Sequence, residues 1–335
     1  MAHAPKNPAI PMRDGVSPSC VALPRLRHSP WPTLLDFLAE RLPRVSRDEW
    51  AQRMASGEVV DDAGQPLPPH APYRHGARVY YWRTLPQEPD IPFQAQVLFR
   101  DERLLVADKP HFLPVTPGGR YVRQSLLVRL KHALNLPDLS PLHRIDRETA
   151  GLVVFSLRPQ DRDAYQRLFR ERRVHKTYEA IAPADAHRRW PLTRRSHILE
   201  CEAAFYKMRE AAPHEGRPPN SETHIDCIEQ RGPWALYRLH PVTGRRHQLR
   251  VHMQGLGLPI VGDQFYPVVR RQPGEPEDFA TPLRLLARAI AFDDPVTGEH
   301  RCFVSQRQLD WPATPEPTEP RDHSATLGLQ NACDT

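Results

Sequence analysis

Hydrophobic positions along the chain follow two patterns, one with helical spacing and one with the short apolar runs of strands. Helical spacing predicts helices over 31–42, 124–135, 160–172 and 246–254. Short apolar runs predict strands over 58–60, 77–81, 97–100, 104–107, 152–156, 178–181, 198–208, 224–230 and 235–239. Because strands outnumber helices and many are joined by short turns, the pattern predicts an α+β fold with a mixed, largely antiparallel central sheet flanked by helices.

Composition divides the chain into a main domain and a smaller N-terminal unit. Residues 1–25 are proline-rich and lack periodicity, which predicts a disordered tail. A small unit follows over 26–85, a proline-containing linker over 86–92, and the main domain over 93–312. Residues 313–335 are polar and proline-rich, and a second disordered tail is predicted there.

The N-terminal unit contains two predicted helices before its strands. Ser46 is the predicted N-cap of the second helix, with Glu49 as its capping-box partner and Gly57 at its end. This order, with the G-x-V-V-x-x-x-G-x-x-L stretch and the later Gly76, resembles a degenerate form of the αL-type RNA-binding domain named after a ribosomal small-subunit protein. A structural cap on the main domain is the alternative interpretation.

Charge and cysteine content narrow the class of protein. The 335 residues carry a formal net charge of +6, with basic clusters at 167–176, 188–195 and 245–250. Such clusters are typical of phosphate-backbone binding, although a solvated helix face is the alternative for any one of them. The 5 cysteines are scattered without a C-x-x-C pair, and no apolar run reaches membrane-spanning length. We therefore expect a cytoplasmic protein in a reducing compartment, without disulfides, structural zinc or membrane association.

The run from His143 to Gly151 is the strongest chemical signal in the chain. It places Asp146 two residues after Arg144 and directly before Arg147, with the apolar run 152–155 behind it. Guanidinium groups favour the ionised form of a neighbouring carboxyl group, so Asp146 is expected to be a carboxylate suited to nucleophilic attack. A structural ion pair at the start of a strand is the alternative interpretation of these residues alone.

The chain contains three further motifs in addition to the run from His143 to Gly151. Asp108-Lys109-Pro110 follows a predicted strand, Lys176-Thr177-Tyr178-Glu179-Ala180 begins another, and the stretch from Thr243 to His252 precedes Gly257-Leu258-Pro259-Ile260-Val261-Gly262-Asp263. In this order and spacing the four motifs resemble the RluA-type pseudouridine synthases over about residues 93–308. The chain departs from the family pattern at Ile145 for Leu, Ala150 for Ser and Leu286 for His.

The resemblance implies a pseudouridine synthase fold and the isomerisation of uridine in structured RNA, either ribosomal or transfer RNA. It implies that Asp146 is the nucleophile, that Tyr178 packs on the uracil, and that Arg245 pairs with the catalytic Asp. Both attack on the ribose and a glycal-type intermediate are compatible with Asp146. Arg144 is expected to fill the space left by the extruded base. The predicted RNA-binding residues are His143, Arg144, Arg147, Lys109, Arg172, Arg173, Lys176, Arg246, His247 and Arg250.

Other classes of function fit the residues less well. A non-catalytic RNA-binding protein would need the basic clusters but not Asp146. A phosphotransferase is disfavoured because Ile145 separates Arg144 from Asp146 and no glycine-rich nucleotide loop precedes them. A serine hydrolase is disfavoured because the chain has no G-x-S-x-G motif. We expect no metal or cofactor, RNA as the partner, and a monomer.

Overall fold

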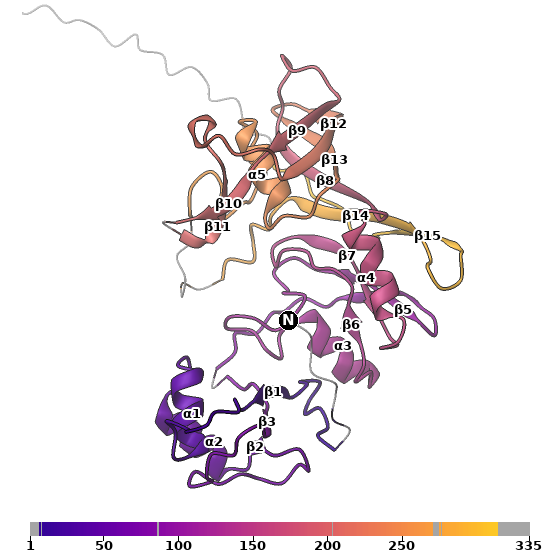
Figure 1. The fold of residues 1–335 in the computed structure, drawn as a ribbon. Helices are drawn as coiled ribbons and strands as arrows, with labels where there is room; N and C mark the ends of the chain where they lie inside the picture. The colour runs from indigo at the N-terminus through magenta and orange to yellow at the C-terminus, as the bar shows by residue number, and fades with distance from the viewer. Residues whose placement is uncertain are drawn as a thin grey trace, which may run out of the picture.

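The computed structural model describes residues 7, 9–85, 87–202, 204–270, 275 and 277–313. Figure 1 shows a small N-terminal unit beside a larger main domain built on one long sheet. Most of the first eight residues, and the predicted tail beyond 313, lie outside the described residues. Within the described part of the chain, no helix is both long and apolar enough to cross a membrane.

The N-terminal unit packs two helices on a small antiparallel sheet with the strand order β1-β3-β2. Its elements are β1 (Ser19–Ala22), α1 (Leu34–Arg41), α2 (Arg47–Ala55), β2 (Val59–Val60) and β3 (Arg78–Tyr81). Thr33 and Ser46 cap the two helices by accepting the backbone N–H groups of Asp36 and Glu49. The Glu49 carboxylate pairs with Arg53 instead of returning to the cap, so the predicted capping box at Ser46 is only half formed.

The predicted N-terminal tail is partly wrong, because residues 19–22 form β1 and pair with β3. Proline-rich composition did not reveal this strand, since its backbone hydrogen bonds are supplied by a strand about 60 residues later in the chain.

The segment before β1 packs on the main domain. Gly15 has a φ of +77°, and a Cβ there would lie 2.4 Å from the Val128 carbonyl oxygen, so the chain approaches α3 (Leu126–Leu134) as only glycine allows.

The main domain is organised by a 10-stranded sheet. Its strands are β4 (Gln96–Arg100), β5 (Leu104–Lys109), β6 (Ser140–Pro141), β7 (Ala150–Ser156), β8 (His175–Pro183), β9 (Leu192–Ser196), β12 (Ser221–Arg231), β13 (Trp234–Pro241), β14 (Leu285–Asp293) and β15 (His300–Val304). Their path is β4-β5-β7-β14-β8-β13-β12-β9, with β15 paired to β14 and β6 to β7. The pair β7–β14 is parallel and the other named pairs are antiparallel, which confirms the predicted fold class.

Helices cover the sheet because successive side chains of β5 and β7 point to opposite faces. Leu105 and Val153 pack with α3 on one face, while Val106 and Val154 pack with α4 (Arg162–Arg170) on the other. Further along the sheet, α5 (Gln248–Gly255) covers β8, β12 and β13. A separate hairpin of β10 (Ile198–Cys201) and β11 (Ala204–Glu210), followed by the short 3₁₀ helix η1 (Pro213–Glu215), lies beside α5.

Candidate active site

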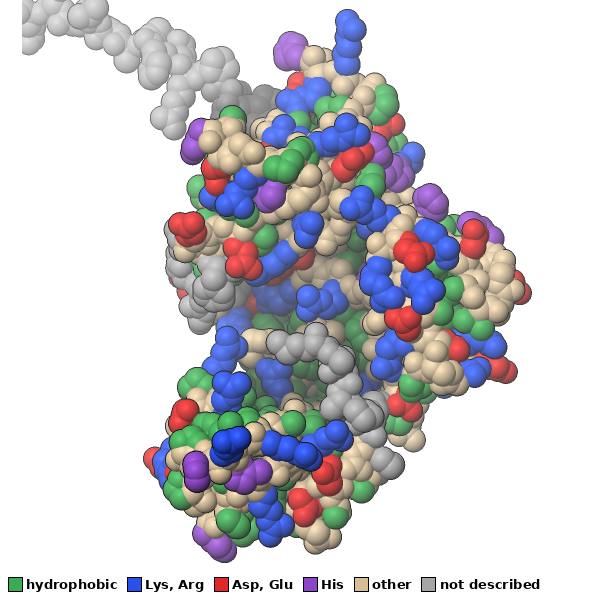
Figure 2. All heavy atoms as spheres, in the orientation of Figure 1, with side chains coloured by type: hydrophobic (Ala, Val, Ile, Leu, Met, Phe, Trp, Pro, Cys, Tyr) green, Lys and Arg blue, Asp and Glu red, His purple; other side chains and the backbone are tan. Residues whose placement is uncertain are grey.

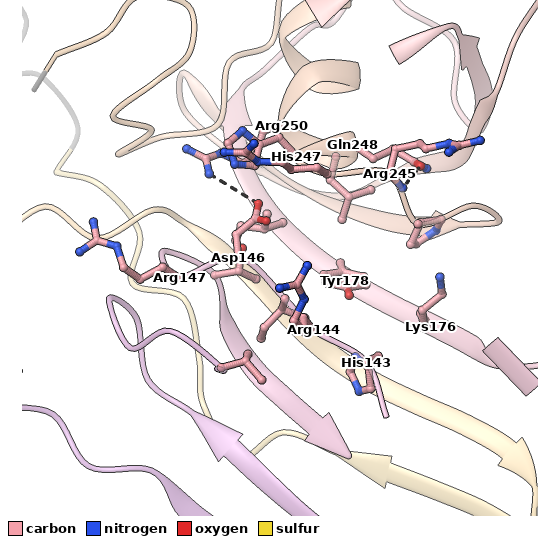
Figure 3. Close-up of a pocket in the computed structure, with 18 of the residues that line it drawn as sticks. His143, Arg144, Asp146, Arg147, Lys176, Tyr178, Arg245, His247, Gln248 and Arg250 are labelled. Atoms are coloured by element: carbon pink, nitrogen blue, oxygen red, sulfur yellow. Dashed lines mark hydrogen bonds and ion pairs between the residues drawn. The ribbon is translucent and has the colours of Figure 1, made fainter. Parts of the chain in front are cut away.

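A cleft of about 940 Å³ collects the predicted chemical motifs from three parts of the sheet. The loop before β7 contributes Asp146, β8 contributes Tyr178, and the segment entering α5 contributes Arg245 and Arg250. The face drawn in Figure 2 is hollowed between the main domain and the N-terminal unit, and Lys and Arg side chains surround the hollow. Figure 3 shows Asp146 between Arg250 and Tyr178, with Arg147 and Arg245 pointing away from it.

The loop that carries Asp146 is held by a close backbone contact at the start of β7. The Thr149 N–H donates to the Asp146 carbonyl oxygen at 3.2 Å, which closes a turn around the carboxylate. Gly151 then adopts a φ of +108°, and a Cβ there would lie 2.3 Å from the Ala287 carbonyl oxygen of β14. Glycine is therefore required where the loop enters the strand, and the resulting fit fixes Asp146 relative to the sheet.

The cationic partner of Asp146 is Arg250. Its Nη1 lies 3.5 Å from Asp146 Oδ2 (dashed in Figure 3), and its guanidinium also forms a double hydrogen bond with Asp263 at 2.6 and 2.8 Å. The Arg250 side chain is fully buried, whereas the Asp146 side chain remains 26% exposed. Burial opposes the charge of Arg250, but Asp263 and then Glu148 and Asp146 raise its pKa further above the ordinary value. Asp146 thus has a permanent buried counterion and an open side toward the cleft.

The predicted pairing of Arg245 with Asp146 is wrong. The Arg245 side chain is exposed, and its Nε donates to the Asn220 carbonyl oxygen at 3.2 Å. The predicted helix over 246–254 begins two residues later, at Gln248, after His247 in a left-handed conformation. Arg250 therefore lies in the first turn of α5 and points inward, while Arg245 stays on the preceding loop.

Glu148 is a site residue that the sequence did not single out. Its carboxylate lies between Arg147, at 2.9 Å, and Arg250, at 3.5 Å. Burial disfavours its charge, but Arg147 and then Arg250 hold the pKa of Glu148 down to about 2. Asp263 was likewise part of a motif without an assigned role. Both carboxylates pair with Arg250, which is 102 residues from Glu148 and 13 from Asp263, and spacing along the chain does not show these pairs.

Tyr178 lies on β8 and faces the cleft near Asp146, as Figure 3 shows. Burial, and then the negative charge of Asp146, raise the pKa of the Tyr178 hydroxyl above its ordinary value. The ring is therefore a neutral phenol at physiological pH, with an apolar face available to a planar base.

Several predicted RNA-binding residues instead support the site from within. Lys109 is fully buried, and its Nζ donates to the carbonyl oxygens of Pro110 and Arg147, both at 3.0 Å. Burial lowers the pKa of Lys109 to about 7, against the opposing charges of Glu148 and Asp146. Arg250 and His247 are also buried, and the His247 ring stacks on Phe265. The predicted RNA contacts of Lys109 and Arg250 are wrong because these two side chains are fully buried. His247 is 7% exposed and lines the cleft, so its predicted contact stays a prediction.

His143 and Arg147 are also engaged within the protein. The His143 ring stacks on Phe169, and its Nε2 accepts the Val154 N–H at 3.1 Å. Burial, and then the charge of Lys176, lower the pKa of His143 to about 3, so its ring is neutral. The Arg147 guanidinium is held by Glu148 and Glu277. These contacts make His143 and Arg147 braces of the loop that carries Asp146.

The remaining predicted cations lie near or at the cleft. Arg144 and Arg172 are exposed and line it, and neither guanidinium has an ion-pair partner in the described part of the chain. Lys176 is half-buried with its Nζ 3.5 Å from the Thr243 carbonyl oxygen, and Arg246 is exposed with a hydrogen bond to the Tyr206 carbonyl oxygen. Arg173 is exposed and pairs with Glu171 at 3.6 Å. The rim of the cleft is formed by the four of these cations that line it, namely Arg144, Arg172, Lys176 and Arg246. They can bind an anionic ligand without breaking the buried ion pairs of Arg250.

Two departures from the family pattern are neighbours in the structure. Ala150 on β7 and Leu286 on β14 are register partners in the parallel pair, and both are buried. The pattern has Ser and His at these positions, so two polar side chains are replaced together by two apolar ones. An apolar pair leaves no unsatisfied polar group in the buried sheet beside the catalytic loop.

Comparisons with known proteins identify the family of this chain. Residues 103–255 match the family model described as RNA pseudouridylate synthase. An uncharacterised RNA pseudouridine synthase of Synechocystis sp. is 34% identical over 241 residues, which cover 70% of this chain and 79% of that protein. The dual-specificity RNA pseudouridine synthase RluA of Vibrio cholerae is 34% identical over 216 residues, covering 63% of this chain and 80% of that protein.

A longer match and a solved structure extend the comparison. The ribosomal large subunit pseudouridine synthase D of Xanthomonas campestris is 30% identical over 291 residues, covering 78% of this chain and 81% of that protein. The structure of human RNA pseudouridylate synthase domain containing 1 is similar in fold, with a TM-score of 0.52 and 24% identity, covering 65% of this chain and 86% of that one.

Proposed function

This chain belongs to the RluA-type RNA pseudouridine synthases and is an isomerase acting on uridine in RNA, and from that premise we propose that Asp146 is the carboxylate that acts on the ribose of the target nucleotide. The observation that carries the proposal is the Asp146–Arg250 pair, in which a buried guanidinium lies 3.5 Å from a carboxylate that lines an open cleft. A carboxylate oxygen with its counterion fixed on one side can attack carbon or remove a proton on the other.

The reaction is an isomerisation with no net gain or loss of atoms. The bond between ribose C1′ and uracil N1 breaks, the uracil turns within the cleft, and a bond forms between C1′ and C5. The proton at C5 leaves and N1 becomes protonated. The Asp146 carboxylate serves either as the group that bonds to C1′ or as the base that leads to a glycal-type intermediate, and both routes require it to be ionised.

Tyr178 is proposed to hold the detached uracil while it turns. Its ring faces the cleft near Asp146, and its raised pKa keeps the hydroxyl neutral. A neutral phenol can pack on a planar base, and its hydroxyl can relay the proton from C5 by giving up its own proton as it takes that one. No step needs a metal or a redox group.

Arg144 is proposed to stabilise the extruded nucleotide. A uridine inside a folded RNA must leave its stack to reach Asp146, which costs a few kcal/mol. The Arg144 guanidinium is exposed at the cleft and has no ion-pair partner among the described residues. A planar cation there can fill the vacated stack and contact phosphate. The rim cations Arg172, Lys176 and Arg246 are proposed to bind the backbone on either side.

The N-terminal unit over 26–85 is proposed to contact RNA as well. Its two loops at 23–28 and 74–78 lie side by side, joined by the hydrogen bonds of Leu23 and Leu26. They expose a group of arginines that have no ion pair among the described residues, namely Arg25, Arg27, Arg74 and Arg78. We propose structured ribosomal or transfer RNA as the substrate and the cytoplasm as the site of action, with a monomer as the working form.

The experiment is to map pseudouridines in cellular RNA from a deletion strain that is complemented with either wild type or Asp146→Asn. We expect at least one uridine to be modified only with the wild type. Restoration of every lost site by Asp146→Asn would overturn the role of Asp146, and an unchanged map in the deletion strain would favour the non-catalytic alternative.

A further inference from the structure

Glu277 pairs with Arg147, the residue that follows Asp146 in its loop. Its carboxylate accepts two hydrogen bonds from the Arg147 guanidinium, at 2.7 and 3.1 Å. Arg120 and the Tyr121 hydroxyl also donate to it, at 3.2 and 3.3 Å. The Glu277 side chain is only 8% exposed. A carboxylate this buried, with this many donors, is held in one position.

The segment that carries Glu277 is anchored independently of that carboxylate. The Phe279 ring packs edge-on against Phe93 and Phe112, with centroids 5.4 and 5.2 Å apart. The neighbouring Asp278 carboxylate accepts the Ala280 N–H at 2.9 Å and the Thr281 hydroxyl. The backbone at 278–281 therefore has its own contacts, and Glu277 reaches Arg147 from a fixed base.

Charges alternate along one path from Glu277 to the proposed nucleophile. Arg147 lies between Glu277 and Glu148, and Arg250 lies between Glu148 and Asp146. The backbone of Arg147 is fixed too, because Lys109 donates to its carbonyl oxygen. Figure 3 shows the Arg147 side chain extending away from Asp146. This direction matters because Arg147 is the sequence neighbour of Asp146.

We propose that Glu277 is a positioning residue, which holds the Arg147 guanidinium away from Asp146, so that Asp146 keeps its ion pair with the buried Arg250. Without the Glu277 charge, Arg147 retains Glu148 and the Tyr121 hydroxyl among its described partners, and it can turn toward Asp146 or draw Glu148 away from Arg250. Either change moves or masks the reacting oxygen. The inference rests on the proposed role of Asp146, while Glu277 itself touches no part of the substrate.

The test is Glu277→Gln, which keeps the side-chain shape and removes its charge. We expect the single-turnover rate of pseudouridine formation to fall about 10–100-fold, since small displacements of a reacting group have effects of this size. The dissociation constant for RNA should stay within about threefold, because Glu277 contacts no phosphate. Glu277→Asp, which keeps the charge, should recover part of the rate. Glu299→Gln removes an exposed carboxylate that pairs with Arg301 and serves as the matched control.

A second comparison separates positioning from folding. In an Arg147→Met background the rate is already reduced, and adding Glu277→Gln should lower it by less than about twofold, because both changes act through one guanidinium. Full additivity of the two losses would overturn the proposal. So would a wild-type rate for Glu277→Gln, or a rate loss matched by an equal loss of folded protein in thermal unfolding. A fully active Asp146→Asn, measured in parallel, would instead refute the proposed nucleophile.

Discussion

The Arg250 guanidinium joins Asp146 and Asp263, two carboxylates that come from different motifs of the main domain. The pairing links the loop before β7 to the segment after α5, so the site exists only when both halves of the sheet are assembled. One carboxylate is buried with the arginine, and the other remains partly open to the cleft.

Replacing Arg250 should therefore be much more damaging than replacing Arg245. Arg250→Met leaves buried carboxylates without their counterion, and we expect the free energy of unfolding to fall by about 3–5 kcal/mol, with loss of isomerisation. Arg245→Ala removes an exposed side chain, so stability should change by less than about 0.5 kcal/mol and only RNA affinity should weaken. Chemical denaturation and single-turnover assays measure both effects. If Arg245→Ala lost isomerisation while Arg250→Met kept it, Arg245 and not Arg250 would be the functional partner of Asp146.

Glu148 should make stability depend on pH in the acidic range. Its pKa is about 2 in the folded protein, against an ordinary value of 4.5. A carboxyl group with a lowered folded-state pKa contributes stability that is complete above the unfolded-state pKa and is lost as pH falls through the folded-state pKa. This contribution is of the order of 3 kcal/mol. The stability difference between wild type and Glu148→Gln should thus narrow as pH falls from about 5 toward 3, and a constant difference would contradict the assignment.

The salt dependence of RNA binding should distinguish Lys109 from Arg172. Each phosphate contact contributes about 0.7–0.9 to the slope of log affinity against log salt. Arg172 is exposed at the cleft, so Arg172→Ala should reduce the slope by roughly that amount. Lys109 is buried, so Lys109→Met should leave the slope unchanged while it lowers the rate. A reduced slope in Lys109→Met would show that the lysine reaches RNA.

Arg144→Ala should affect folded RNA more than unfolded RNA. The arginine is proposed to occupy the space of the extruded base, and extrusion is needed only where the uridine is stacked. We expect the rate to fall at least about tenfold more on a stem-loop than on an unstructured oligonucleotide of the same sequence, because a few kcal/mol of unstacking separate the two substrates. Equal losses on both substrates would exclude this role.

Sequence patterns predicted the fold class and the core strands because those depend on local periodicity. The short apolar runs of β5 and β7 and the Asp146 motif are readable within a few residues. The ion pairs that join residues across the cleft could not be predicted from local sequence patterns. Arg245 and Arg250 are five residues apart, and the start of α5 at Gln248 decides which one points inward. Glu277 lies outside the four motifs, and its pairing with Arg147 could not be predicted because the two residues are 130 positions apart in the chain.

The most direct test of the account is the single-turnover rate of Asp146→Asn on an RNA that the wild type modifies. The account predicts a rate reduced by at least about 10³-fold, because the amide cannot act as nucleophile or base, with RNA affinity within about tenfold because phosphate contacts dominate binding. Conversion by Asp146→Asn at the wild-type rate would contradict the account.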